Sequence, residues 1–157
     1  MYQKNIFRSI LWAGFLVGAA DIVAAFLHYI IATGKNPERV LWFIASGVWG
    51  KDAYSGGLQM AVAGLLLHFL IAYAFTILFF FLYPRLNLGS KNKIVIGSLY
   101  GIFIWLVMNL IVVPLSNTQK FGFSIKQTAI GIFILIIAIG IPLSFIAGRF
   151  FSKEKPN

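Results

Sequence analysis

The chain has 157 residues, of which 60% are hydrophobic and only 11% are charged, and its mean hydropathy is +0.89. This composition excludes an ordinary soluble domain and indicates an integral membrane protein. The formal net charge of +9 does not indicate a nucleic-acid binder, because the basic residues stand at the ends of apolar segments instead of gathering on one face among aromatic residues.

Four apolar segments are long enough to cross the hydrocarbon core of a bilayer, which takes about 20 helical residues. They lie near residues 10–32, 58–83, 94–114 and 128–150. Each is expected to be a helix, because the bilayer core offers the backbone no water as a hydrogen-bond partner. The sequence therefore predicts an all-α fold, with residues 1–157 forming a single membrane domain built as a four-helix bundle.

The first segment contains the stretch AADIVAAFLHY, which places Asp21 and His28 inside an apolar run. A charged side chain at the centre of a membrane helix costs roughly 2.5–3.5 kcal/mol on insertion scales, so Asp21 needs an explanation. Lys4 and Arg8 resemble the basic start of a secretory signal peptide, and VGAAD offers small residues for cleavage. The apolar run continues through IVAAFLHYIIA to the length of a full span, so we interpret the segment as a membrane helix.

A shorter helix is predicted near residues 37–49, within GKNPERVLWFIASGVWGKDAYSGG. Its apolar part is about half the length needed to cross a bilayer. We expect it to lie in the interface or to be re-entrant, either as a linker on the lipid surface or as a functional lid. The residues expected at headgroup depth or in the loop that follows are Trp42, Trp49, Lys51 and Asp52.

Small residues accompany the polar ones on the first span. Gly14, Asp21 and His28 recur every seven residues and so lie on nearly one line of a helix, with Gly18 beside them. Membrane helices pack through small residues, which let two backbones approach closely. Asp21 is therefore expected to face protein and not lipid.

The second span repeats this pattern, with Ala61, Gly64, His68 and Ala72 on one face. Two such faces are natural partners, and both Asp21 and His68 lie near the middle of their spans. The sequence thus predicts a contact between Asp21 and His68. His28 and Asn109 lie nearer the opposite end from the termini and are candidates to extend a polar track toward that surface.

The third and fourth spans also carry small-residue faces that predict close helix packing. Pro142 lies inside the fourth span, where a proline predicts a kink in the helix. The packing residues expected on these two spans are Gly97, Gly101, Gly140, Ser144 and Gly148.

The intramembrane Asp and His are open to two interpretations. Such residues form proton relays in membrane proteins, yet they also form interhelical hydrogen bonds that only fix the packing. Metal binding is weakly indicated, because the two His and the Asp stand on separate spans without a close-spaced ligand motif. Haem held by His28 and His68 is disfavoured, because the two residues differ in depth. We expect no cofactor and no metal.

Signatures of catalysis are largely missing. The sequence contains no G-x-S-x-G elbow, P-loop, H-E-x-x-H or S-x-x-K motif. Cysteine is absent, which excludes a thiol nucleophile and a disulfide framework. The GKDAY segment offers a Lys and an Asp near the membrane surface, but such neighbours commonly form a solvated turn. We expect the protein not to be an enzyme.

The distribution of basic residues predicts the orientation. Lys4, Arg8, the 85–93 region and the C-terminal tail fall on one side of a four-span protein. The basic residues of the other side are diluted by Glu38 and Asp52. The positive-inside rule therefore places both termini in the cytoplasm.

Several stretches together resemble a known family. They are ASGVWGKDAYSGG, GLLLHFLIAYAF, YPRL and GSLYGIFIWLVMNLIVVPLS. In combination they look like the YagU-like family of small four-helix bacterial inner-membrane proteins. The resemblance implies a location in the bacterial inner membrane, and it implies no activity.

Two functional classes follow from these observations. One is a packing or accessory protein, whose partners are the lipid bilayer and a second copy or a larger membrane complex. The other is a small proton-linked transporter or permeability factor that uses Asp21 and His68. Four helices enclose little volume, so a transporter of this size is expected to form a homo-oligomer.

Overall fold

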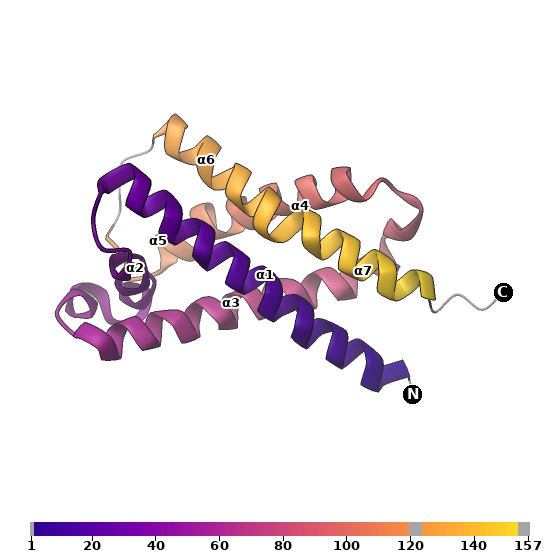
Figure 1. The fold of residues 1–157 in the computed structure, drawn as a ribbon, viewed down its shortest axis with the longest axis horizontal. Coiled ribbons are helices and arrows are strands. Elements are labelled where there is room, and N and C mark those ends of the chain that lie inside the picture. Colours follow the sequence, from indigo (N-terminus) through magenta and orange to yellow (C-terminus); the bar gives the residue numbers. More distant parts are fainter. Residues whose placement is uncertain (1, 120–123, 154–157) are drawn as a thin grey trace.

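The structure is a computed structural model that describes residues 2–119 and 124–153. Figure 1 shows long helices running side by side, with the starting end of α1 and the final end of α7 at the same end of the molecule. The described residues form helices and turns, with no strand among them. In chain order the elements are α1 (Tyr2–Thr33), α2 (Glu38–Trp49), η1 (Gly50–Tyr54), α3 (Gly57–Arg85), η2 (Leu88–Ser90), α4 (Lys93–Val107), η3 (Met108–Val112), α5 (Val113–Leu115), α6 (Ile125–Leu135), η4 (Ile136–Gly140) and α7 (Ile141–Lys153).

Four of the helical runs are long and apolar enough to cross a membrane, which confirms the predicted fold class. The four are Ile6–Thr33, Gly57–Arg85, Lys93–Leu115 and Ile125–Ser152. Each is somewhat longer than its predicted span. The helices continue past the apolar stretch to residues that can hydrogen-bond to the free backbone groups at the helix ends. Asn92, for example, caps α4 by accepting hydrogen bonds from the backbone N–H groups of Ile94 and Val95.

The third and fourth spans each contain one wide, π-helical turn. The turns η3 (Met108–Val112) and η4 (Ile136–Gly140) each end two residues before a proline, Pro114 and Pro142. A proline ring collides with the carbonyl group four residues earlier, and in both spans that carbonyl lies within the wide turn. The irregularity expected at Pro142 therefore takes the form of a widened turn inside a continuous span.

The short helix α2 is built into the bundle at the end opposite the termini (Figure 1). It packs mainly on α3, and its Ala45 and Ser46 are fully buried. The backbone N–H of Asn117 donates to the Gly47 carbonyl at 3.0 Å, and the Asn117 side chain donates to the Val48 carbonyl at 3.0 Å. These contacts hold α2 between α3 and the segment that follows α5.

The half of the bundle nearer the termini holds an aromatic core between α3, α4 and α7. Phe79, Tyr83 and Leu143 are almost completely buried, and the rings of Phe79 and Tyr100 lie 4.6 Å apart. The Tyr100 hydroxyl donates to the Phe75 carbonyl at 2.6 Å, which satisfies a polar group inside an apolar core. This core fixes the positions of α3 and α4 relative to each other in this half of the bundle.

Candidate functional site

Two glycines of α1 let this helix approach α3 closely. A Cβ atom on Gly18 would lie 2.9 Å from a ring carbon of Phe69 and 3.2 Å from the Cβ of Ala72. A Cβ on Gly14 would collide with the ring of Tyr73. Both glycines are buried, so the small-residue face of α1 packs against α3.

This close approach places His68 of α3 against the backbone of α1. The His68 Nε2 atom lies 2.9 Å from the Gly18 carbonyl oxygen. A carbonyl oxygen can only accept a hydrogen bond, so His68 donates from Nε2. The ring of Phe69 packs edge-on against the imidazole, with centroids 5.5 Å apart. The imidazole is therefore fixed in orientation, and its Nδ1 atom is left to accept or to bind a proton.

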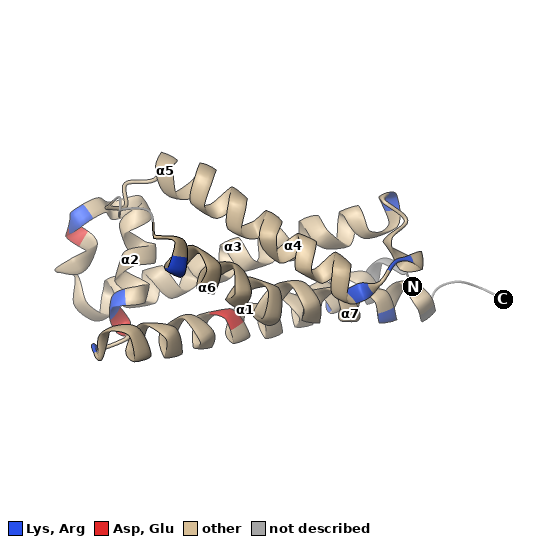
Figure 2. Ribbon diagram, turned by 90° about the horizontal axis from the view of Figure 1, so that it is seen from above, with Lys and Arg blue, Asp and Glu red and all other residues tan. Residues whose placement is uncertain are grey.

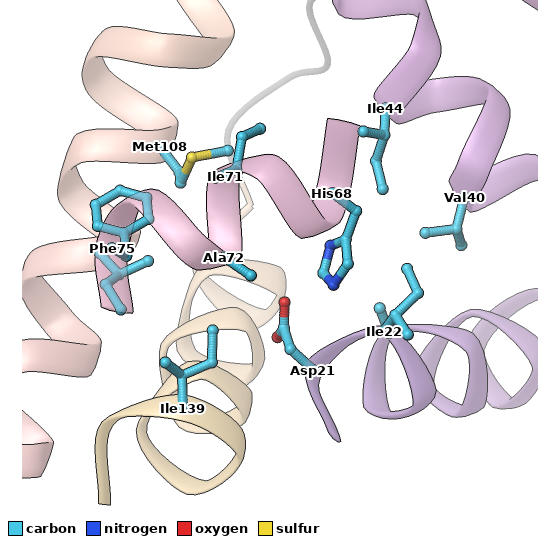
Figure 3. A pocket seen from close by; sticks show the side chains of 12 residues that line it. Asp21, Ile22, Val40, Ile44, His68, Ile71, Ala72, Phe75, Met108 and Ile139 are labelled. Carbon is cyan, nitrogen blue, oxygen red and sulfur yellow. The ribbon is translucent and has the colours of Figure 1, made fainter. Parts of the chain in front are cut away.

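A pocket of about 190 Å³ lies beside this hydrogen bond, near the middle of the spans. Figure 3 shows the Asp21 carboxylate and the His68 imidazole directed into the same space, surrounded by apolar side chains. All four spans and α2 contribute to the wall. The lining residues are Asp21, Ile22 and Ala25 of α1, Val40 and Ile44 of α2, His68, Ile71, Ala72 and Phe75 of α3, Ile104 of α4, Met108 of η3 and Ile139 of η4.

Asp21 and His68 are the two titratable residues of this lining. Their charges interact electrostatically, but the hydrogen bond of His68 goes to Gly18 and not to Asp21. Across residues 2–119 and 124–153, the Asp21 side chain has no hydrogen bond or ion pair within direct contact distance. The two residues predicted to touch therefore share one pocket, in which the carboxylate has no hydrogen-bond donor.

The other two members of the predicted polar track lie outside this pocket. Asn109 is exposed, and its amide donates to the carbonyl of Trp105 on its own helix at 3.0 Å. The neighbouring Met108 points into the pocket instead, because successive residues of a helix point in different directions. His28 lies two turns along α1 from Asp21 and is also absent from the lining. Neither residue extends the pocket lining, so the polar track toward the surface stays a prediction.

Glycines also control the packing of the third span on the fourth. A Cβ on Gly97 would lie 2.6 Å from the Cα of Ile141, and one on Gly101 would lie 2.7 Å from the Cα of Ile136. A Cβ on Gly140 would collide with the Gly97 carbonyl oxygen. Backbone therefore meets backbone between α4 and the η4–α7 segment.

The remaining predicted packing residues lie at other contacts. Gly64 faces α2 and not the first span, because a Cβ at this position would collide with the Leu41 carbonyl oxygen. Gly148 lies against Tyr83 and Lys93. Ser144 is fully buried, and among the described residues its hydroxyl has no hydrogen-bond partner.

The residues expected near the membrane surface lie at the end that α2 closes. The indole N–H of Trp42 donates to the Gly57 carbonyl at 3.0 Å, which ties α2 to the start of α3. Trp49, Lys51 and Asp52 are exposed. These exposed side chains follow the buried part of α2 and do not reach the pocket.

Sequence reasoning missed the contribution of α2 to the pocket. Val40 and Ile44 form one wall, whereas the sequence predicts only that the short helix lies in the interface or is re-entrant. The sequence carries one relevant signal, the small residue Gly64, which marks a close contact on α3 but does not say which helix makes it.

The donor set of the site does not suit a metal ion. Within the described ranges, no three His, Cys, Asp or Glu side chains are grouped closely enough to hold one. A protein site for a hard cation takes several oxygen ligands, whereas this pocket offers one carboxylate among hydrocarbon walls.

No protein-family model, curated protein or solved structure matches this chain.

Proposed function

We propose that this multi-pass membrane protein is a small proton-linked transporter or permeability factor, and that Asp21 and His68 are its proton-binding residues. The observation that carries the proposal is the Asp21 carboxylate in a mid-span apolar pocket, without a hydrogen-bond donor among the described residues. A purely structural aspartate in a membrane span is expected to be hydrogen-bonded, because a charge without a partner among apolar side chains is unfavourable.

Proton binding explains why such a carboxylate is placed beside an imidazole. A proton on Asp21 removes the unfavourable charge, and an imidazole ring can both donate and accept a proton. The hydrogen bond from Nε2 to Gly18 leaves the second ring nitrogen available for a proton.

The second candidate function is that of a non-catalytic packing or accessory protein. It is favoured by the same His68–Gly18 hydrogen bond, which links α1 to α3 directly. Interhelical hydrogen bonds in membranes contribute about 0.6 kcal/mol on average, which suffices to fix a register. In this case Asp21 contributes only through its charge interaction with His68.

We further propose a location in the bacterial inner membrane, in line with the resemblance to the YagU-like family, and a homo-oligomeric assembly. Both termini are placed in the cytoplasm by the positive-inside rule. The pocket between the four spans and α2 measures only about 190 Å³, so a complete transport path is expected to need a second copy.

Proton flux into liposomes tests the proposal. Purified protein is reconstituted with an internal pH dye, and an imposed pH gradient is followed for the wild type, Asp21→Asn and Asp52→Asn at matched folded yield. Asp52 is exposed outside the pocket, so its variant is a matched control for the loss of one carboxylate. We expect flux in the wild type and in Asp52→Asn, and none in Asp21→Asn. Equal flux in the wild type and both variants, or no flux in the wild type, would contradict the transport proposal and favour the packing function.

A further inference from the structure

The Asp21 pocket has the charge and polarity of a receptor for an organic cation. Its wall is formed by aliphatic side chains, Phe75 and Met108, and Asp21 is the acidic residue among them. An anion placed here would meet the carboxylate in a medium of low dielectric constant, where like charges repel strongly. A neutral molecule would leave the carboxylate without compensation. A ligand with one positive charge satisfies both conditions.

The same wall disfavours an inorganic cation. Metal ions lose their hydration shell on binding and need several oxygen atoms to replace it. Apart from Asp21, the wall offers His68, whose Nε2–H already donates to Gly18, and hydrocarbon surfaces. An ammonium group that carries an apolar substituent needs fewer polar partners, because its substituent contacts hydrocarbon.

The size of the pocket limits the ligand to a few heavy atoms. A cavity of about 150 Å³ lined by apolar side chains binds benzene in another protein. The pocket described here measures about 190 Å³, which leaves room for a ring of that size and one attached ammonium group. The ring of Phe75 belongs to the wall, and aromatic faces attract organic cations.

We propose that this pocket binds a small organic ammonium cation, with the ammonium group at the Asp21 carboxylate and the apolar substituent against Phe75, Met108 and Ile139. The inference rests on the proposed function, which it deepens by naming the class of cargo. His68 contributes by charge: when it is protonated, it competes with the ligand for Asp21.

This competition links the cation to protons. Asp21 on α1 and His68 on α3 are the titratable lining residues, and the residues that α2, α4, η3 and η4 contribute are apolar. Protonation of Asp21 removes the negative charge of the pocket, and protonation of His68 adds a positive charge beside it. Affinity for the cation is therefore expected to fall as the pH is lowered, and binding of the cation is expected to release protons.

Calorimetric titration of the full chain in detergent with benzylammonium tests the binding. Benzyl alcohol is the neutral probe of nearly the same size. We expect saturable binding of benzylammonium that is weakened about tenfold or more in Asp21→Asn and unchanged in Asp52→Asn. The affinity should also fall as the pH is lowered, because protonation of Asp21 removes the charge that binds the ammonium group. Equal affinities of the two probes, or equal affinities in the wild type and Asp21→Asn, would overturn the inference.

A pocket-filling variant keeps the test decisive if Asp21→Asn does not fold. Ala25→Leu adds volume to the pocket wall without changing a charge. We expect it to abolish benzylammonium binding, whereas Ala20→Leu, at an exposed position of the same helix, should bind like the wild type. Undiminished binding in Ala25→Leu would place the ligand elsewhere and overturn the inference.

The binding experiment and the flux experiment test the two proposals independently of each other. If benzylammonium binds in the pocket but no proton flux is measured, the organic-cation site stands and the transport function falls. If proton flux depends on Asp21 but benzylammonium does not bind, the proposed function stands and the inference about the cargo falls.

Discussion

Gly18 links the packing of the bundle to the chemistry of its pocket. Because it has no side chain, Phe69 and Ala72 approach α1 closely, and the Gly18 carbonyl becomes the acceptor for His68. Asp21 follows three residues later and so enters the pocket beside this bond. Gly18 thus contributes both to the close approach of two helices and to the orientation of the imidazole.

Replacement of Gly18 by Ala should therefore damage stability and site together. The added Cβ lies too close to Phe69 and Ala72, so α1 and α3 must separate or their side chains must shift. We expect a loss of about 1–3 kcal/mol, which is typical of overpacking a core. Thermal unfolding in detergent measures it, and Ala20→Val, an enlargement at an exposed position, is the control. A Gly18→Ala protein as stable as the wild type would contradict this account of the α1–α3 contact.

Glycines of both helices take part in the close packing of α4 on the η4–α7 segment. A Cβ on Gly97 or on Gly140 would meet backbone atoms, which cannot rotate away as a side chain can. Gly131 of α6 faces the Trp105 side chain of α4 instead, and a Cβ added at Gly131 would lie 3.2 Å from the indole nitrogen. Equal substitutions at Gly97 and Gly131 should consequently have different effects.

Gly97→Ala is expected to destabilise the protein by about 1–3 kcal/mol, because the neighbouring backbone must move. Gly131→Ala is expected to be close to neutral, because Ala is intrinsically more favourable than Gly in a helix by up to about 1 kcal/mol, which offsets a mild contact. The midpoints of thermal or denaturant unfolding of the two variants, measured under the same conditions, test this difference. If Gly131→Ala is the more damaging of the two, the backbone contact at Gly97 is not what holds the pair together.

The sequence predicted the spans because a bilayer requires long apolar helices, and their hydropathy is visible without a structure. It also marked the faces of Gly18, Gly97 and Gly140 as sites of close approach. It did not identify the partner of each face, so Gly64 was assigned to the first span although it packs on α2. Helical periodicity gives the direction of a side chain on its own helix but not which neighbour it meets. For the same reason the α2 wall of the pocket was missed.

The attachment of α2 depends on a residue far along the chain. Asn117 hydrogen-bonds to the carbonyls of Gly47 and Val48 near the C-terminal end of α2, where carbonyl groups have no partner within the helix. Asn117→Ala removes the side-chain bond, which is worth about 1 kcal/mol. We expect the amides of α2 to exchange hydrogen about fivefold faster, as measured by mass spectrometry. Gln119→Ala, nearby and exposed, should leave the exchange unchanged; equal rates in both variants would show that α2 is held by α3 alone.

Charge is distributed unequally along the whole molecule. Figure 2 shows that charged residues gather at the two ends of the bundle, with an acidic residue midway along α1. The end with the termini is uniformly basic in the described side chains, whereas Glu38 and Asp52 dilute the basic residues at the other end. Since Lys and Arg are retained on the cytoplasmic side, this asymmetry favours one orientation of the bundle. The basic residues are Arg8, Arg85, Lys91, Lys93 and Arg149 at the first end, and Lys35, Arg39, Lys51 and Lys126 at the second.

Because the chain contains no cysteine, single introduced cysteines can report the orientation directly. The variants Lys35→Cys, Asp52→Cys and Lys126→Cys lie at the end closed by α2, and Lys91→Cys lies at the end with the termini. An impermeant thiol reagent added to intact cells should label the first three and spare Lys91→Cys, which should be labelled once the cells are permeabilised. The opposite pattern would reverse the orientation and place the termini outside. Labelling of Lys35→Cys and Asp52→Cys from opposite sides would mean that α2 crosses the membrane, which its 12 residues are too few to do as a single helix, because about 20 are needed.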